Sequence, residues 1–253
     1  MAYIITFANQ KGGVGKTTSA VNVAACIASR GKRVLIIDMD PQGNTTSGLG
    51  IGKRDLRHTM YEVLLGSASA KEAIVATRHE NLFVLPTNIN LAASEFDLVD
   101  TQERQWHFKK AISPIAEDYD IIIVDCPPSL GILTINALAA SNGVIIPMQC
   151  EFFALEGLSQ LMLTIRKIKQ LYNRQLEITG ILLTMYNPRL NLTTQIVGEL
   201  KKYYADKLFR TPIPRNVKLS EAPSFGEPII YHDKNSKGAQ CYFDVADEIL
   251  SRV

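Results

Sequence analysis

Short runs of apolar, mostly β-branched residues recur along the chain, and they predict the strands of one sheet. The runs cover residues 3–8, 34–37, 82–85, 121–124, 144–146 and 178–183. Within them the apolar residues are largely continuous rather than alternating with polar ones. Such continuity is typical of strands that are covered on both faces. The pattern therefore predicts a mostly parallel sheet between two layers of helices.

Stretches with helical spacing of apolar residues lie between several of these runs. The predicted helices cover residues 19–28, 104–116, 155–171, 194–204 and 240–250. Alternation of strands and helices is the signature of an α/β doubly wound sheet. No Pro/Ser-rich linker and no internal repeat divides the chain, so we expect one domain over residues 1–253. Ligands of such sheets bind beyond the carboxyl ends of the strands.

A glycine-rich loop follows the first predicted strand and precedes the first predicted helix. Residues 9–18 read Asn-Gln-Lys-Gly-Gly-Val-Gly-Lys-Thr-Thr. Strand, glycine loop and helix present backbone N–H groups to phosphate oxygens, and glycine lets the backbone approach an anion closely. The predicted nucleotide-binding residues of this loop are Lys11, Gly12, Gly13, Val14, Gly15, Lys16, Thr17 and Thr18.

The loop departs from the general phosphate-loop pattern at one position. The pattern requires glycine at position 10, where this chain has Gln10, and a second lysine, Lys11, precedes the glycine pair. Lys16 is placed to reach the β- and γ-phosphates of a nucleotide, and the Thr17 hydroxyl to ligate Mg²⁺. The sequence therefore predicts a phosphate site that takes Mg²⁺.

Acidic residues follow two of the other predicted strands. Asp38 and Asp40 come directly after residues 34–37, and alternation places them on the same side, with Asp40 further out. Asp125 follows residues 121–124, the Walker B pattern. A Walker B carboxylate helps hold Mg²⁺, and because Mg²⁺ keeps several waters we expect Asp125 to act through one of them. Asp38 and Asp40 could instead only cap the loop that follows.

Together these motifs resemble the ParA/MinD group of ATPases, which have a deviant Walker A loop. The resemblance covers nearly the whole chain and is strongest to chromosomal ParA proteins of the Soj type. Besides the phosphate loop, the matching segments in family order are residues 38–44, 125–129, 182–189 and 213–224. The resemblance implies an ATPase that dimerises with ATP and Mg²⁺, binds DNA non-specifically as a dimer and is activated by a ParB-type protein.

The resemblance also assigns roles that the residues alone do not reveal. Lys11 would cross to the nucleotide of a partner subunit, and with Lys16 and Asp40 it forms the expected catalytic set. Asp40 would position or activate the attacking water. Asn187 and Pro214 would flank the adenine.

DNA binding is likewise implied by the resemblance. The candidate residues are Arg189, Lys201, Lys202, Arg215 and Lys218. Phosphate contacts need only positive charge gathered on one face. The alternatives stay open that Lys201 and Lys202 are an exposed helix face and that Arg215 supports the nucleotide loop.

The composition of the chain narrows the classes of protein to which it could belong. The formal net charge of +2 gives no strong global field toward nucleic acid, so DNA binding requires a local basic patch. The four cysteines are scattered without metal-ligand spacing, which argues against zinc and against a disulfide framework. No basic leader and no apolar run of membrane-spanning length is present. We therefore expect a cytoplasmic, nucleoid-associated protein.

Three alternatives remain at this point. A MinD-like ATPase that binds membrane would need a basic amphipathic C-terminal helix, whereas residues 244–253 carry three acids and one arginine. An iron–sulfur reductase would need cysteines that bridge a dimer, and Cys126 and Cys150 do not match that pattern. A metabolic kinase or ligase is not excluded by Lys11, but the segments at 38–44 and 125–129 favour the partitioning ATPase.

Overall fold

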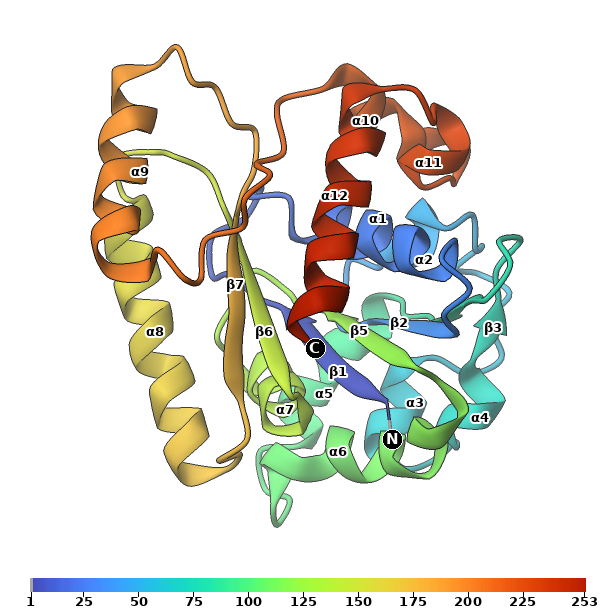
Figure 1. Ribbon diagram of the computed structural model, residues 1–253. Coiled ribbons are helices and arrows are strands. Elements are labelled where there is room, and N and C mark those ends of the chain that lie inside the picture. Colours follow the sequence, from blue (N-terminus) through green and yellow to red (C-terminus); the bar gives the residue numbers. More distant parts are fainter. Residues whose placement is uncertain (1) are drawn as a thin grey trace.

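A computed structural model describes residues 2–253, and a single seven-stranded sheet forms its centre (Figure 1). The strand order is β3-β4-β2-β5-β1-β6-β7. The strands are β1 (Tyr3–Phe7), β2 (Val34–Asp38), β3 (Val75–Ala76), β4 (Leu82–Leu85), β5 (Ile121–Asp125), β6 (Gly143–Met148) and β7 (Glu177–Leu183). The short edge strand β3 is antiparallel to β4, and the other neighbouring pairs are parallel. The predicted mostly parallel α/β sheet is confirmed.

Helices cover both faces of this sheet (Figure 1). The longest are α1 (Lys16–Ala28), α7 (Ile132–Ala140), α8 (Ala154–Leu171), α9 (Asn191–Tyr204) and α12 (Lys237–Arg252). The shorter α-helices are α2 (Asn44–Gly48), α3 (Met60–Leu65), α4 (Ala70–Ala73), α5 (Ser94–Asp97), α6 (His107–Ile112), α10 (Val217–Glu221) and α11 (Ile229–His232). Within residues 2–253, no helix has both the length and the apolar character that crossing a bilayer requires.

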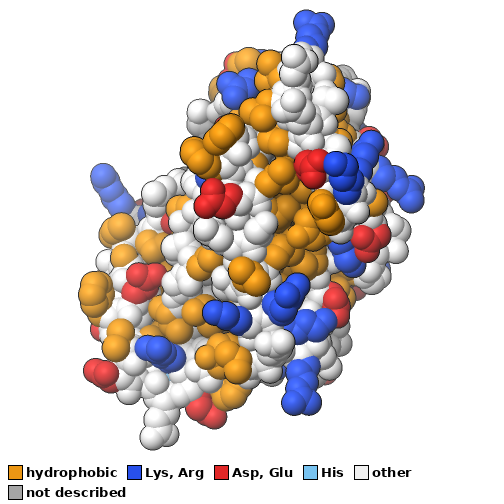
Figure 2. Space-filling view, turned by 90° about the vertical axis from the view of Figure 1, so that its left-hand side faces the viewer, with side chains coloured by type: hydrophobic (Ala, Val, Ile, Leu, Met, Phe, Trp, Pro, Cys, Tyr) orange, Lys and Arg blue, Asp and Glu red, His pale blue; other side chains and the backbone are white. Residues whose placement is uncertain are grey.

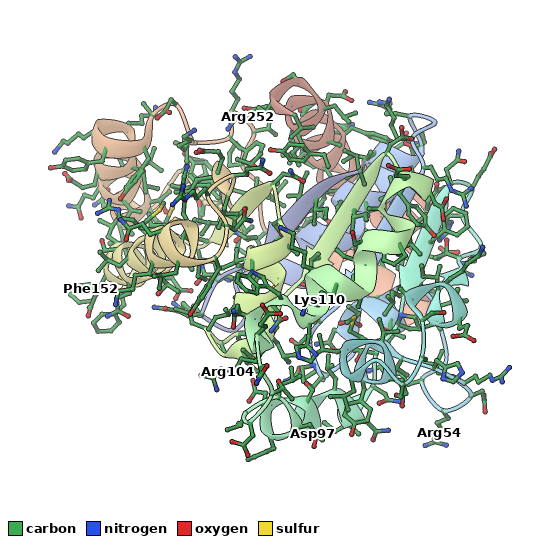
Figure 3. All side chains as sticks on the ribbon, turned by 90° about the horizontal axis from the view of Figure 1, so that it is seen from below. Arg54, Asp97, Arg104, Lys110, Phe152 and Arg252 are labelled. Carbon is green, nitrogen blue, oxygen red and sulfur yellow. The ribbon has the colours of Figure 1, made fainter. Side chains whose placement is uncertain are left out.

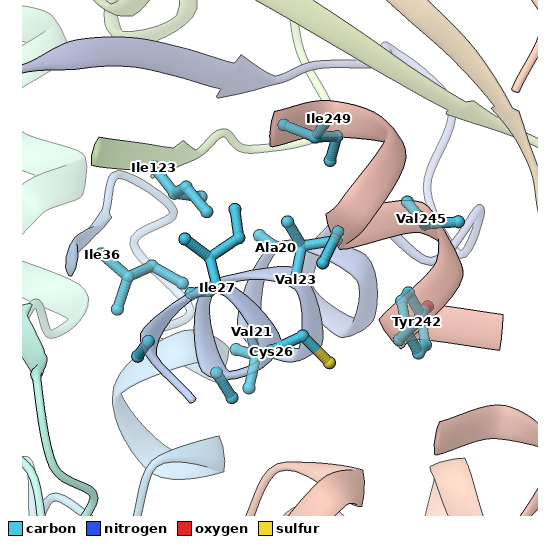
Figure 4. Close-up of a cluster of buried hydrophobic side chains, with 14 of the residues drawn as sticks. Ala20, Val21, Val23, Cys26, Ile27, Ile36, Ile123, Tyr242, Val245 and Ile249 are labelled. Carbon is cyan, nitrogen blue, oxygen red and sulfur yellow. The ribbon is translucent and has the colours of Figure 1, made fainter. Parts of the chain in front are cut away.

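The helices α1 and α12 pack together against one face of the sheet (Figure 4). Ile27 of α1 lies fully buried beside Ile36 of β2 and Ile123 of β5, and Val245 and Ile249 of α12 complete the same cluster. Burial of apolar surface on this scale is the main term that stabilises the fold. Helices α3, α6 and α7 cover the other face around β2 and β5, and α8 and α9 cover it around β6 and β7.

The predicted helix over residues 104–116 is wrong as a continuous element. The segment is divided into a 3-10 turn at Arg104–Trp106, helix α6 at His107–Ile112 and a further 3-10 turn at Ser113–Asp118. Pro114 lies in the first turn of the last piece. Because proline has no backbone N–H and clashes with the preceding turn, α6 ends just before it.

Two labelled residues mark the two helical layers on either side of the sheet (Figure 3). Arg252, at the end of α12, lies on one side, where its Nη1 donates to the carbonyl of Thr179 near the start of β7. Asp97, at the end of α5, lies on the opposite side. The glycine loop and the strand-end carboxylates follow the carboxyl ends of β1, β2 and β5, which lie together because these neighbouring strands are parallel.

Candidate nucleotide-binding site

Three neighbouring strands bring the sequence motifs together. Strand β5 lies between β1 and β2, and in register Asp125 is paired with Phe7 on one side and with Asp38 on the other. The glycine loop follows β1 and the acidic loop follows β2. The acidic loop and the glycine loop therefore lie on either side of the end of β5, which itself supplies Asp125.

The glycine loop has the backbone shape that a phosphate cradle needs. Gly13 and Gly15 have φ angles of 75° and 81°, in the left-handed region that favours glycine. The Thr184 hydroxyl donates to the carbonyl of Val14 (2.8 Å), and Gln149 Nε2 donates to the carbonyl of Gly13 (2.7 Å). Helix α1 then starts at Lys16 without a side-chain cap, which leaves its first N–H groups for an anion.

Lys16 is buried in this loop, with 7% of its surface exposed. Its Nζ donates to the carbonyl oxygen of Lys11 at 3.0 Å. Burial lowers the pKa of Lys16, and the negative charges of Asp125 and Asp40 act in the opposite direction. A cation held here without a full set of partners is placed to receive phosphate oxygens.

A cavity of about 320 Å³ opens at this loop. It is lined by Gly12, Gly13, Gly15, Lys16, Thr17, Thr18, Asp40, Gln42, Asn44, Pro128 and Met185. Most of the predicted phosphate-site residues thus line one space together with Asp40. Val14 is buried behind the loop, and Lys11 does not line this cavity.

A second cavity of about 480 Å³ adjoins the first, because Gly15, Thr18 and Met185 line both. Its other walls include Ile213, Pro214, Arg215 and Leu219, and it is more apolar than the first, as a base-binding pocket tends to be. Pro214, which the resemblance assigns to the adenine, lines this cavity. Asn187 does not line this cavity: it is exposed, and its Oδ1 accepts from the backbone N–H of Arg189 (3.1 Å).

Asp125 fits a role at a metal ion. Its carboxyl group is fully buried, and Oδ2 accepts a hydrogen bond from the Thr45 hydroxyl (2.8 Å). Among residues 2–253, Oδ1 has no hydrogen-bond partner. Burial raises the pKa of Asp125 to about 6, while the hydroxyls of Thr17 and Thr45 act to lower it. A buried carboxylate oxygen without a partner is costly, and a hydrated cation beside Thr17 would compensate it.

Asp38 and Asp40 have separate surroundings. Asp40 lines the phosphate cavity, and its Oδ1 accepts from the backbone N–H of Gln42 (3.0 Å). Asp38 is fully buried and accepts from the backbone N–H (2.8 Å) and the hydroxyl (2.7 Å) of Thr46. Burial first, and then the charge of Asp125, raises the pKa of Asp38 to about 7. Asp38 therefore anchors helix α2, whereas Asp40 faces the space where a phosphate would lie.

Lys11 projects from the edge of the site. Its side chain is 44% exposed and forms an ion pair with Glu151, which follows β6. Exposed pairs of this kind contribute little to stability. Lys11 is therefore held loosely, outside the cavity of its own chain.

The candidate DNA-binding residues are exposed and spread over two regions. Arg189 precedes α9, Lys201 and Lys202 lie near its end, and Arg215 and Lys218 lie at α10. Lys202 pairs with Glu199, and Lys218 with Glu221. On the side of the molecule formed by α8 and α9, lysines and arginines are scattered among apolar and acidic side chains (Figure 2).

Sequence reasoning missed four lining residues of the phosphate cavity: Gln42, Asn44, Pro128 and Met185. All four lie in the family segments at residues 38–44, 125–129 and 182–189, whose pattern assigns no role to each residue separately. Met185 has a positive φ of 48°, which no sequence pattern indicates for this residue type.

Known proteins resemble this chain over its whole length. A family model described as an AAA domain matches residues 2–178. The sporulation initiation inhibitor protein Soj of Bacillus subtilis is 54% identical over 251 residues, which are 99% of each chain. The chromosome partitioning protein ParA of Myxococcus xanthus is 49% identical over 98% of this chain and 88% of its own.

The chain belongs to the ParA/Soj family of chromosome-partitioning ATPases. A structure of a Mycobacterium smegmatis protein, described as cobyrinic acid a,c-diamide synthase with bound ATP analogue and magnesium, also superimposes, with a TM-score of 0.86. It is 36% identical and covers 99% of this chain and 95% of its own. The predicted family membership and ATPase activity of this ParA-family chain are thus confirmed.

Proposed function

We propose that this ParA-family ATPase is a nucleotide-gated switch in chromosome or plasmid partitioning, acting as one domain in the cytoplasm on the nucleoid. With ATP and Mg²⁺ bound, two chains form a dimer that binds DNA without sequence preference. Hydrolysis, stimulated by a ParB-type protein, returns the chain to the monomer. The observation that carries the proposal is the cavity that the phosphate loop, Thr17 and Asp40 line together, in a chain 54% identical to Soj.

ATP would lie across the two adjoining cavities. The first N–H groups of α1, the Gly12–Gly15 backbone and Lys16 bind the phosphates, and Pro214 lies against the base in the second cavity. Asn187 reaches the adenine only after a local change, because in this structure it lies outside the cavity lining. Thr17 and Asp125, through water, hold Mg²⁺, which supplies positive charge to the β- and γ-phosphates.

Asp40 is the residue proposed to orient the attacking water. It lines the phosphate cavity and is nine-tenths buried, so its carboxylate is held where solvent is restricted. Phosphoryl transfer depends mainly on positioning and electrostatics rather than on covalent chemistry by the protein. Loss of Asp40 therefore removes the hydrolytic step and leaves ATP binding in place.

The proposed dimer depends on Lys11. Its ammonium is outside its own cavity and is paired with Glu151 at the surface, so it can be released toward the nucleotide of a second chain. A cation supplied in this way stabilises phosphate charge only when two chains meet. Dimerisation would also place two sets of the basic residues Arg189, Lys201, Lys202, Arg215 and Lys218 on one particle, which raises DNA affinity through effective concentration.

The membrane-binding alternative is opposed by the packing of α12. Its apolar residues, including Tyr242, Val245 and Ile249, are buried against α1 and the sheet. Asp247 pairs with Arg30 at the surface, and the largely buried side chain of Glu248 pairs with Arg252. A helix whose apolar face is already covered has none left to insert into a lipid surface.

The test is DNA binding in parallel with vesicle binding. Purified protein is mixed with unrelated DNA duplexes or with anionic vesicles, in ATP, in ADP and without nucleotide. The proposal predicts retention on every duplex in ATP, weak retention in ADP, and no sedimentation with vesicles in any state. Vesicle binding in ATP together with no DNA retention would reject it in favour of the MinD-like alternative.

A further inference from the structure

Helix α2 is tied to the ends of two strands by buried threonines. Thr46 donates to Asp38 Oδ2 from both its backbone N–H (2.8 Å) and its hydroxyl (2.7 Å). The same hydroxyl accepts from the backbone N–H of Thr87 (3.0 Å), beyond β4. Thr46 and Thr87 are fully buried. These contacts fix α2 against the end of β2 and the segment that follows β4.

The preceding residue, Thr45, reaches the next strand. Its hydroxyl donates to Asp125 Oδ2 at 2.8 Å, and both residues are 0% exposed. Asp38 and Asp125 are paired in register on β2 and β5. Because Thr46 is anchored on Asp38, Thr45 is held at the position from which it meets Asp125.

This contact gives the two carboxylate oxygens of Asp125 different surroundings. Oδ2 is occupied by Thr45, whereas Oδ1 is buried without a hydrogen-bond partner in residues 2–253. A buried acceptor that lacks a partner loses its solvation without compensation. The hydroxyl of Thr17 lies close enough to this carboxyl group to lower its pKa, and Thr17 also lines the phosphate cavity. Oδ1 is therefore the atom left for a ligand from outside the protein.

We propose that Thr45 is a positioning residue for Mg²⁺: its hydroxyl holds Asp125 Oδ2 and leaves Oδ1 for a water ligand of the metal. The inference rests on the proposed binding of ATP with Mg²⁺. Outer-shell partners of this kind typically change metal affinity by ~10–100-fold when they are removed. Asp40 and Thr45 belong to one short segment, so the carboxylate proposed to orient water and the metal site are mechanically connected.

The experiment measures by calorimetry how the affinity for a non-hydrolysable ATP analogue rises with the Mg²⁺ concentration. The series starts from a sample in EDTA, which contains no free Mg²⁺. The variants are Thr45→Val, Thr45→Ala and Thr45→Ser. Thr6→Val is the matched control, because its buried hydroxyl bonds that of Ser141 (2.6 Å) away from the site. Thermal melting in EDTA reports folding, and Thr45→Ala keeps the test open if the added methyl of valine is not accommodated.

The expected result is that Thr45→Val and Thr45→Ala need about tenfold more Mg²⁺ for half of the affinity gain, with unchanged affinity in EDTA. Thr45→Ser and Thr6→Val should follow the wild type. Wild-type Mg²⁺ dependence in Thr45→Val and Thr45→Ala, or an equal shift in Thr45→Ser or Thr6→Val, would overturn the inference alone. A wild type without Mg²⁺-dependent binding would overturn the proposed function, and the inference with it.

Discussion

Lys16 and Asp40 follow different strands and line one cavity. In the proposed mechanism Lys16 binds the phosphates, and Asp40 orients the attacking water. Lys16 belongs to the start of α1 and is buried against the loop carbonyl of Lys11. Asp40 lies beyond β2 and is fixed by the N–H of Gln42. At this scale, sequence reasoning could name both residues because each stands in a recognisable motif. It placed Asp40 further out than Asp38, but it could not give Asp38 a role of its own, since only the fold turns Asp38 toward Thr46.

Replacing Lys16 by alanine is expected to weaken ATP affinity at least about tenfold, because alanine cannot form a charge-assisted hydrogen bond with the phosphates. Titration calorimetry of the variant measures this effect. Lys32→Ala, which removes an exposed lysine just beyond α1, is the control and should bind as the wild type does. Unchanged affinity in Lys16→Ala would place the nucleotide elsewhere.

Asp40→Ala is expected to separate binding from hydrolysis. Steady-state turnover should fall about 100-fold or more, in the range expected when an acid–base or water-positioning group is removed, while ATP affinity stays near that of the wild type. Glu80→Ala removes an exposed carboxylate outside the site and should keep full turnover. Wild-type turnover in Asp40→Ala would refute the water-positioning role.

Lys11→Ala is expected to impair ATP-dependent dimerisation more than ADP binding. The physical reason is that Lys11 lies outside its own cavity, so its charge matters only where a second chain supplies the nucleotide. Light scattering with a non-hydrolysable ATP analogue gives the mass. Glu151→Gln, which frees Lys11 from its ion pair, should still dimerise. A dimer of normal stability in Lys11→Ala would exclude a role across the interface.

At the scale of elements, six strand runs and most long helices could be predicted because continuous apolar runs and helical spacing are local signals. The ends are less predictable. Helix α1 begins at Lys16, three residues before the predicted Ser19, because the glycine loop rather than a capping side chain sets its start. Strand β3 has two residues and pairs antiparallel with β4, a pairing that its own sequence does not indicate. The position of β5 between β1 and β2 follows from chain topology and not from any motif.

The junction of α11 with the turn before β4 predicts a pH effect. The His79 ring stacks on Tyr231 (centroids 3.9 Å apart), and burial, with the charge of Arg78, lowers the pKa of His79, against an opposing effect of Glu227. The folded state therefore favours the neutral ring. This contribution to the free energy of unfolding is complete above the ordinary pKa of 6.5 and is lost as pH falls below it.

Chemical denaturation between about pH 5 and pH 8 tests this, because His79→Phe keeps the stacked ring but removes the titration. The variant should lose less stability on acidification than the wild type. His107→Phe is the control, since it replaces a histidine that lies away from this junction and contacts the Leu64 carbonyl through Nδ1 (3.2 Å). Equal acid sensitivity in His79→Phe and the wild type would contradict the assignment.

The basic positions beside α9 and in α10 predict a salt-dependent DNA interaction. Arg189→Ala or Lys218→Ala should weaken binding to all duplexes alike and flatten the plot of log affinity against log salt by ~0.9 for each phosphate that the variant no longer neutralises. ATP turnover without DNA should be retained. Lys71→Ala, at exposed α4, should leave the slope unchanged. Weaker binding to one DNA sequence alone would contradict non-specific binding.

At the scale of the molecule, the proposed mechanism is one switch with two states. The phosphate cavity lies at the strand ends of β1, β2 and β5, and Lys11 projects beside it at the surface, where the proposal places a second chain. A net charge of +2 gives one chain little attraction to DNA, so two joined chains are needed for firm binding. The apolar face of α12 is buried inside the fold, which supports the proposal that the dimer is recruited to DNA rather than to membrane.

The most direct test is sedimentation of a labelled DNA duplex with the Asp40→Ala variant, in ATP with Mg²⁺ or in ADP with Mg²⁺. This variant is expected to keep ATP bound for the whole run. We predict that in ATP the duplex acquires protein in steps of two chains, and that in ADP it sediments as free DNA. Equal DNA occupancy in the two nucleotides, or binding in steps of one chain, would contradict the proposed switch.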